Sequence, residues 1–463
     1  MRLKFLVLSF LLTTFLFSDE NLLKKDFDYF IKLENSQKSY ENTISILENI
    51  SNVNKIIFDE YAKKIDYDET LAVLQCMNAS AKSLVSTNSD CIAAGLDLKK
   101  ALTLTPLELN SIILKLEDNY PLLAKELKII NSPIPFTKLV SSSKDIIYDL
   151  YLNATNSFLY DKLNYRLPNK TIQKLEDDKR FEKFLSLIIS NPKLNFLQSS
   201  FLDYDDSNSN YNISFNLALN RVLNKKLDDQ TTKYLQNALS KARVQYEKDK
   251  VNFWLYLLNN DSISLTSLKE STNSNIYTLY IKQLSKKVIQ IDDSFKILKY
   301  DFLEKCSNEK KILINSYAKT LSFFDENKIS LEFDLGLMQI NLKKADVISI
   351  FNNLDAKRDE LLIPRINILY YSYILDEVKA EFPHALMQFY AYIYDVDYLK
   401  DRLKFDLFRI KNRYEPYLSL ELFGNESAKE FIYNYIIYTK IIDKKEISLE
   451  EFFKNLFQLS NLD

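Results

Sequence analysis

The sequence predicts an all-α fold, and three observations lead to it. Glycine occurs 3 times and proline 9 times in 463 residues, whereas hairpins, bulges and phosphate loops depend on glycine. Apolar residues recur at steps of three and four, as in 230–258, which is the spacing of one helix face. Hydrophobic residues make up 46% and charged residues 27%, as in ordinary globular proteins with room for two or three domains.

The N-terminus has the pattern of a secretory signal peptide. Arg2 and Lys4 precede an apolar run over 5–17 that ends at Ser18, and this run is too short for a typical membrane span. We therefore expect a signal peptide at 1–18, a mature chain that starts at Asp19, and a periplasmic location. Contact with a membrane is expected only through this peptide before cleavage; the alternative is an uncleaved anchor.

Residues 19–297 form a string of short amphipathic segments. Polar breaks such as 203–212 and 259–262 separate these segments. Many short helices joined by polar turns indicate stacked helical hairpins, which form an α-solenoid, superhelix or ring. No fixed sequence period is present, so any repeats are degenerate.

Three cysteines occur in the chain, Cys76, Cys91 and Cys306. Because an exported chain meets an oxidising compartment, we expect Cys76 and Cys91 to pair. Closing a loop of this length stabilises by about 3 kcal/mol in the chain-entropy model. The alternative is two buried thiols on neighbouring helices. No metal site is expected, since no histidine or second cysteine accompanies Cys306.

Charge and motifs exclude several classes of function. The net charge is −2, which offers no basic excess for a nucleic-acid partner. Walker and dinucleotide-binding glycine motifs are absent from the sequence, so no cofactor is expected. His384 is the only histidine, which leaves Ser-His and Cys-His catalysis without a base; we expect it to be an incidental loop residue.

Two motifs in the last third carry a family resemblance. Residues 317–324 read Tyr-Ala-Lys-Thr-Leu-Ser-Phe-Phe, and 336–340 read Gly-Leu-Met-Gln-Ile. The pair resembles the soluble lytic transglycosylase family, in which Ala-Arg-x-Glu-Ser-x-Phe precedes Gly-Leu-Met-Gln at this spacing. The resemblance implies a lysozyme-like helical domain over 298–463, after a helical superstructure over 19–297. Weaker matches to that superstructure occur at 249–257 and 274–280.

The family's catalytic acid has no counterpart in this chain. In the family a Glu protonates the glycosidic oxygen of peptidoglycan, as glycosidic cleavage requires. Counting back fifteen residues from Gly336 reaches Leu321, and Ser322 and Phe324 match the residues after the acid. Leucine cannot donate a proton, so no catalytic residue is expected, and we expect Leu321 to be largely buried against the segments of Met338 and Tyr392.

Four carboxylates lie between the two motifs and are expected to be solvated loop charges. They are Asp325, Glu326, Glu332 and Asp334.

Other departures from the family pattern also argue against a working glycan cleft. Residues that are small or polar in the family are bulkier or less polar here, so the resemblance implies a narrowed or closed cleft. The substituted positions are Leu342, Tyr371, Ile393, Tyr394 and Asp395.

Seven residues match positions that line or support the sugar site in the family. Core packing is an equally weighted alternative for the apolar ones. These residues of the remnant substrate cleft are Ser330, Met338, Gln339, Tyr392, Tyr414, Glu421 and Glu426.

These expectations combine into one interpretation and two alternatives. The chain is interpreted as a periplasmic, non-catalytic relative of the lytic transglycosylases that binds peptidoglycan glycan strands or a cell-wall enzyme. One alternative is an active transglycosylase with a displaced acid. The other is a structural helical scaffold with no affinity for glycan.

Overall fold

A computed structural model describes residues 68–459, apart from 288, 290, 292, 331–333, 342–343, 346–347, 350–351, 353–357, 395–398, 400–413 and 424–425. The expected signal peptide at 1–18, and the expectations for Glu332, Leu342 and Asp395, lie outside these residues. The chain divides into two compact units. The first unit comprises the described parts of 1–75 and 298–377, and the second comprises those of 76–297 and 378–463.

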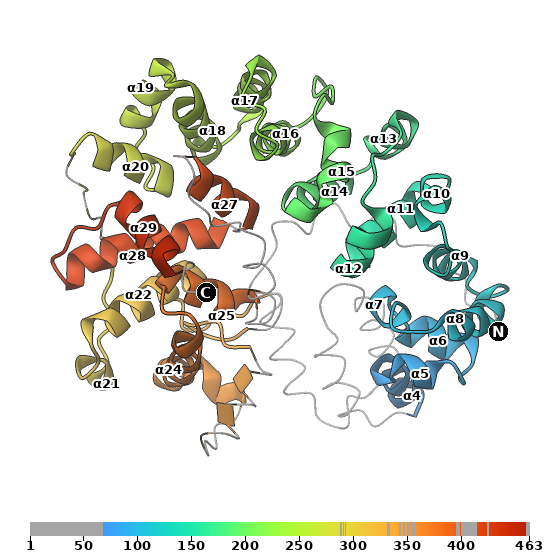
Figure 1. Cartoon of the computed structure of the whole chain (residues 1–463). Coiled ribbons are helices and arrows are strands. Elements are labelled where there is room, and N and C mark those ends of the chain that lie inside the picture. Colours follow the sequence, from blue (N-terminus) through green and yellow to red (C-terminus); the bar gives the residue numbers. More distant parts are fainter. Residues whose placement is uncertain are drawn as a thin grey trace. The chain divides into compact units, whose positions relative to one another are not determined.

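The predicted all-α class is confirmed for the described residues (Figure 1). Their only β-type pairings are two isolated antiparallel bridges, Ile329–Leu335 and Leu335–Ile340. A change of unit coincides with the expected boundary at 297/298, and residues 378–463 group with 76–297. The division into a signal peptide and two domains stays a prediction.

The helices of the second unit before residue 298 are mostly short, as their many polar breaks predict. They follow α4 (Asp68–Asn78), which begins in the first unit: α5 (Ala81–Leu84), α6 (Ser89–Gly95), α7 (Leu98–Ala101), α8 (Pro106–Leu116), α9 (Pro121–Ile130), α10 (Pro135–Val140), α11 (Lys144–Asn153), α12 (Asn156–Phe158), η2 (Leu159–Leu163), α13 (Asn169–Leu175), α14 (Phe181–Ile189), η3 (Pro192–Leu194), α15 (Asn195–Gln198), η4 (Ser199–Phe201), α16 (Tyr211–Leu223), α17 (Asp229–Lys241), α18 (Gln245–Asn259), α19 (Ser262–Glu270) and α20 (Ile276–Leu284).

Helix α8 shows how the sequence starts and buries such a helix. The Thr105 hydroxyl accepts from the Glu108 N–H, and the Glu108 carboxylate accepts from the Thr105 N–H, which closes a capping box. Pro106 occupies the first turn, where no N–H is needed. The buried face has steps of three, one and three residues: Leu109, Ile112, Ile113 and Leu116.

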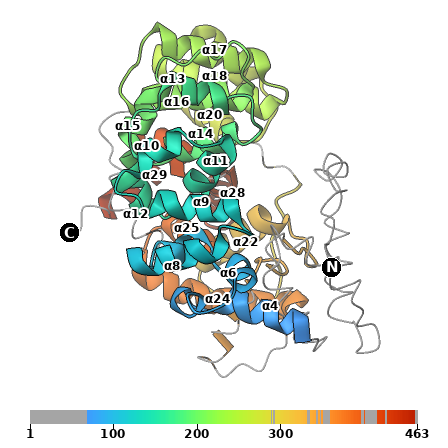
Figure 2. The ribbon, with the colours of Figure 1, turned by 90° about the vertical axis from the view of Figure 1, so that its right-hand side faces the viewer.

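Helices α16 to α20 pack on their neighbours in sequence, as expected of a helical solenoid. Helices α16, α17 and α18 lie side by side in Figures 1 and 2. Short polar turns connect them, and Asp228 caps α17 by accepting from the Thr231 N–H.

A disulfide between Cys76 and Cys91 ties α4 to α6, with the Cα atoms 5.1 Å apart. The two helices approach so closely at Gly95 that a Cβ there would lie 2.0 Å from the Cys76 carbonyl oxygen. The Lys100 ammonium donates to three backbone oxygens at the ends of α4 and α6. Its positive charge therefore lies where helix C-termini are negative.

The part of the chain from residue 298 onward contains the two motifs at 317–324 and 336–340. The first unit contains α21 (Asp301–Glu304), α22 (Asn308–Ser322), η5 (Arg358–Leu362) and most of α24 (Pro364–Glu381). The second unit ends with α25 (Ala385–Tyr394), α27 (Glu415–Phe423), α28 (Glu426–Ile442) and α29 (Leu449–Leu459). Within it α25 packs on α28, where the rings of Phe389 and Phe431 stack at 4.3 Å.

His384 lies in the loop before α25, as expected, but the expectation that it is incidental is wrong. Its ring is buried and accepts from the Leu386 N–H through Nδ1, while Nε2 lies 3.2 Å from the Phe452 carbonyl oxygen. Burial lowers the pKa of His384 to about 4. The neutral imidazole thus joins the start of α25 to α29.

Candidate functional site

Helix α22 carries Leu321, the residue that the resemblance aligns with the family's acid. Ser307 caps its first turn. In its last turn the Ser322 hydroxyl donates to the Ala318 carbonyl at 2.8 Å. Phe323 and Phe324 follow with positive φ angles of 53° and 63°, which turns the chain out of the helix.

Leu321 has intermediate exposure, so most of the residue is covered. That it packs against the segments of Met338 and Tyr392 stays a prediction. It lies on the last turn of α22, two residues before the exposed Phe323. The adjacent Thr320 and Ser322 are buried. A leucine in this setting has no ionisable group and offers only apolar contact.

The described carboxylates after α22 have other partners. Asp325 accepts from the Asn327 N–H, and Glu326 accepts from the Tyr300 hydroxyl at 3.1 Å; both carboxylates are exposed. Asp334 accepts from the Asn341 side chain at 3.0 Å. These contacts are typical of loop carboxylates.

The Gly-Leu-Met-Gln motif forms a tight turn around the buried side chain of Asn367. Asn367 Nδ2 donates to the carbonyl oxygens of Leu335 and Leu361 at 2.7 Å each, and Oδ1 accepts from the Met338 N–H at 2.7 Å. Gly336 has φ 72°, and a Cβ there would lie 2.6 Å from Asn367 Nδ2. The turn therefore requires glycine, both for its positive φ and for the close approach of Asn367.

Met338, Gln339 and Ser330 have structural contacts in this turn. Met338 is fully buried, and the Gln339 amide donates to the Gly336 carbonyl at 2.7 Å. Ser330 exchanges two bonds with Asp334: its N–H donates to the Asp334 carbonyl, and its hydroxyl accepts from the Asp334 N–H. These contacts favour the packing interpretation for Met338 and a turn-stabilising role for the other two.

The predicted cleft residues lie in both units. Ser330, Met338 and Gln339 belong to the first unit, together with Leu321. Tyr392, Tyr414, Glu421 and Glu426 belong to the second unit. Whether any of them contacts glycan stays a prediction.

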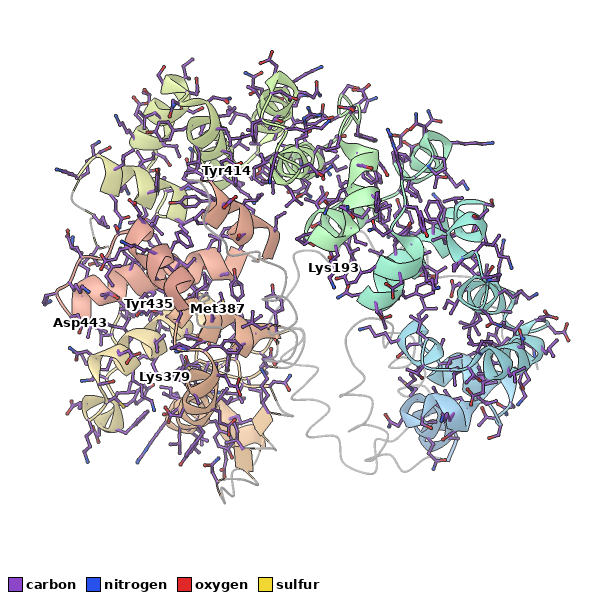
Figure 3. All side chains as sticks on the ribbon, in the orientation of Figure 1. Lys193, Lys379, Met387, Tyr414, Tyr435 and Asp443 are labelled. Atoms are coloured by element: carbon purple, nitrogen blue, oxygen red, sulfur yellow. A yellow bond between two sulfur atoms is a disulfide. The ribbon has the colours of Figure 1, made fainter. Side chains whose placement is uncertain are left out.

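In the second unit Tyr392 is buried on α25, and Tyr414 immediately precedes α27 (Figure 3). The Tyr414 carbonyl accepts the Leu418 N–H and so begins that helix.

Glu421 is the centre of a buried ionic cluster. Its carboxylate accepts from the Lys429 ammonium at 2.5 Å and lies 3.2 Å from that of Lys250. It also accepts from the Tyr277 hydroxyl at 2.6 Å and the Trp254 indole N–H at 3.4 Å. Only 3% of the Glu421 side chain is exposed, so every one of these contacts compensates for lost hydration.

Glu426 completes the cluster from the start of α28. It accepts from Lys429 at 2.9 Å, from Lys250 at 3.1 Å and from the Tyr246 hydroxyl. Burial disfavours the charged carboxylates, but the two ammonium groups outweigh burial and hold the pKa of Glu421 below its usual value and that of Glu426 at about 2. The cluster fastens α27 and α28 to α18 and α20.

Sequence reasoning missed the partners of these two carboxylates. Lys250 and Trp254 lie within 249–257, and Tyr277 lies within 274–280. These are the two segments that weakly resemble the helical superstructure of the family. The resemblance marked these segments but did not show that they contact Glu421 and Glu426. The partners on α18 and α20 are 144 to 180 residues away in sequence.

Comparison with known proteins adds a family match. Residues 304–394 match the family described as the Transglycosylase SLT domain. No curated protein matches the sequence. Among solved structures, the chain is similar to an inactive mutant of the lytic transglycosylase Slt from Pseudomonas aeruginosa, with a TM-score of 0.44 and 11% identity over 93% of this chain and 94% of that one.

We predict that Asn367→Ala lowers the free energy of unfolding by about 2–3 kcal/mol. The variant loses three buried hydrogen bonds, and a buried polar group left unpaired costs about 1–3 kcal/mol. Urea denaturation followed by circular dichroism measures the change. The matched control is Asn327→Ala, whose side chain is exposed and which should change stability by no more than about 0.5 kcal/mol; equal effects of the two substitutions would contradict the role of Asn367.

We predict that Glu421→Gln destabilises the protein by about 3–5 kcal/mol, because removing one partner leaves buried charge uncompensated. The control is Glu270→Gln on the exposed end of α19. A carboxyl whose folded pKa is lowered stabilises above its unfolded pKa of about 4.5, and this contribution is lost as pH falls toward 2. Denaturation between pH 6 and 2 should therefore show a shallower loss for Glu421→Gln than for the unsubstituted protein; identical slopes would contradict the cluster.

Proposed function

We propose that this protein binds peptidoglycan outside the cytoplasm and does not cleave it, because residues 304–394 match the Transglycosylase SLT domain. A role related to peptidoglycan follows from the domain itself. The observation that supports the finer proposal is Leu321 at the end of α22, where the resemblance places the family's acid.

Cleavage of a glycosidic bond needs a proton donor within about 2.6–3.2 Å of the leaving oxygen. Leu321 offers no such group. Asp325 and Glu326 are exposed and engaged with Asn327 and Tyr300. Their environment supports their interpretation as loop charges and gives no support to a displaced acid.

The Gly-Leu-Met-Gln motif forms a tightly bonded turn around Asn367, which supports retained binding. Gly336 and Asn367 keep a tight turn that no catalytic step in this chain explains. A turn of this kind fixes the direction of neighbouring side chains, which is the requirement of a binding surface.

Two features support a location outside the cytoplasm. The disulfide between Cys76 and Cys91 is of the kind that persists in oxidising compartments. The N-terminal pattern over 1–18 has the features of an export signal. None of the described helices is both long and apolar enough to cross a membrane.

We predict that the purified protein co-sediments with peptidoglycan sacculi. Binding is read as the fraction of protein in the pellet, with protein alone as the sedimentation control. Leu321→Glu provides the matched variant, and it should sediment equally, because position 321 is partly exposed and carries no ion pair with the described residues. A pellet fraction no greater than that of the protein alone would favour the structural scaffold and contradict the proposal.

A further inference from the structure

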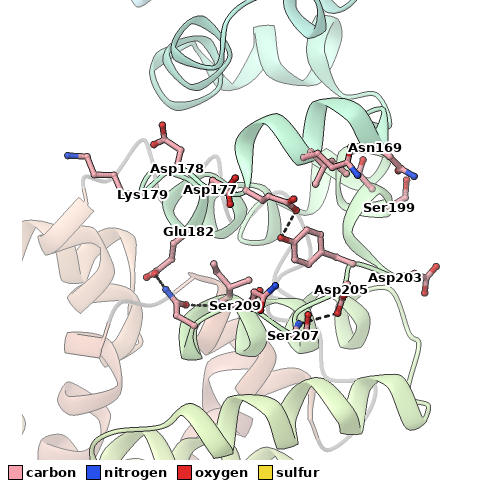
Figure 4. A pocket seen from close by; sticks show the side chains of 18 of the residues that line it. Asn169, Asp177, Asp178, Lys179, Glu182, Ser199, Asp203, Asp205, Ser207 and Ser209 are labelled. Atoms are coloured by element: carbon pink, nitrogen blue, oxygen red, sulfur yellow. Dashed lines mark hydrogen bonds between the residues drawn. The ribbon is translucent and has the colours of Figure 1, made fainter.

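Helix α29 is attached to the second unit through a buried histidine. His384 is the only histidine of the chain, and 8% of it is exposed. Asp177 and Asp205, by contrast, line a polar cavity of about 890 Å³ (Figure 4) and are exposed. Water solvates their charges, whereas a charge on His384 would lie inside the protein, where an ion is costly.

The two ring nitrogens of His384 have different partners. Nδ1 accepts from the Leu386 N–H in the first turn of α25, and Nε2 lies 3.2 Å from the Phe452 carbonyl oxygen of α29. Because a carbonyl oxygen can only accept, Nε2 carries the proton of the neutral ring. A second proton would sit on Nδ1, opposite the Leu386 N–H, and would replace that hydrogen bond by two opposed donors.

Two buried phenylalanines attach α29 to its neighbours. The ring centroid of Phe453 lies 5.3 Å from that of Tyr417 in α27, and the ring centroid of Phe452 lies 5.7 Å from that of Tyr435 in α28. The His384 ring meets Phe452 edge-on, with the centroids 4.8 Å apart. The hydrogen bond from Nε2 and this ring contact therefore join His384 to the same residue of α29.

A second polar contact holds the start of α29. The Gln283 amide of α20 donates to the Ile447 carbonyl at 3.0 Å and accepts from the Leu449 N–H at 2.9 Å. An amide side chain has no titratable proton, so this contact does not respond to pH. Of these two polar anchors, His384 is the one that titrates.

Among the described residues, no charged side chain shifts the pKa of His384. Burial lowers this pKa to about 4, and only the hydrogen bond to the Phe452 carbonyl opposes that shift. Helix α25 has tyrosines but no charged residue. The charged or titratable groups that flank the contacts of the ring in sequence are Lys379 and Glu381 on α24, Tyr433 and Tyr435 on α28, and Glu450, Glu451 and Lys454 on α29.

We propose that His384 makes the attachment of α29 sensitive to acid: the helix is closed at neutral pH and opens locally as the pH falls. In the closed state the buried ring resists a second proton. Once α29 has left, the ring is exposed to water and binds that proton with its usual pKa of 6.5. A base whose pKa is lowered in the closed state stabilises that state above pH 6.5, and this contribution is lost as the pH falls toward 4.

Opening of α29 uncovers an aromatic surface. Tyr417 of α27 and Tyr435 of α28 lose their ring contacts with Phe453 and Phe452 when the helix leaves. The pH therefore controls whether this surface is covered. The inference concerns the second unit alone and does not depend on the proposed function.

Hydrogen exchange of the full chain, measured by mass spectrometry at pH 7 and pH 5, tests the inference. Each exchange rate is divided by the intrinsic rate at that pH, which leaves the equilibrium constant for opening. With the two pKa values of the closed and open states, opening of α29 should rise about twentyfold from pH 7 to pH 5. Peptides from α17 are the internal reference, and their opening should change by less than about twofold, because carboxylates with usual pKa values stay ionised in this window.

His384→Gln is the matched variant. Its amide can accept from the Leu386 N–H and donate to the Phe452 carbonyl, but it does not titrate. Opening of α29 in this variant should therefore change by less than about twofold between the two pH values. No rise in the unsubstituted protein, an equal rise in the variant, or an equal rise in α17 would overturn the inference.

A second measurement does not depend on the folding of any variant. Because the chain has one histidine, an NMR titration of the untagged protein follows a single imidazole signal. The midpoint is expected near pH 4, and a midpoint at the usual 6.5 would overturn the inference.

Discussion

The buried side chain of Asn367 is the constraint on which the motif region depends. One amide group bonds three backbone groups, two in the Gly336 turn and one in η5, the segment before α24. Its proximity excludes a side chain at position 336, and its bond to Met338 fixes the next step of the turn. The sequence pattern Gly-Leu-Met-Gln, followed later by Asn-Ile, is thus accounted for by packing and hydrogen bonds alone.

If the protein does not cleave glycan, as proposed, this constraint explains why the motif persists without its chemistry. The acid's position at the end of α22 takes part in none of the bonds that hold the turn. Replacement of an acid by Leu321 therefore leaves the turn intact, whereas replacement of Asn367 or Gly336 would not. Stability preserves the framework residues, and only function preserves the acid.

The fold class could be predicted because its causes are local. Scarce glycine and apolar steps of three and four residues act within single helices, and the all-α structure follows from them. The pairing of Cys76 with Cys91 could be predicted from the expected oxidising compartment and from the spacing of the two residues.

The ionic cluster of Glu421 could not be predicted, because its partners on α18 and α20 are brought to it by tertiary packing. The same holds for His384, whose partner Phe452 lies 68 residues away.

The account makes catalysis and binding separable in this protein, and the release of 1,6-anhydromuropeptides tests that separation most directly. Purified protein is incubated with sacculi, and the soluble products are identified by mass spectrometry against a heat-denatured sample. The account predicts no release above that background, because Leu321 has no proton to donate. Release that increases with protein concentration, from a preparation free of other peptidoglycan enzymes, would contradict it.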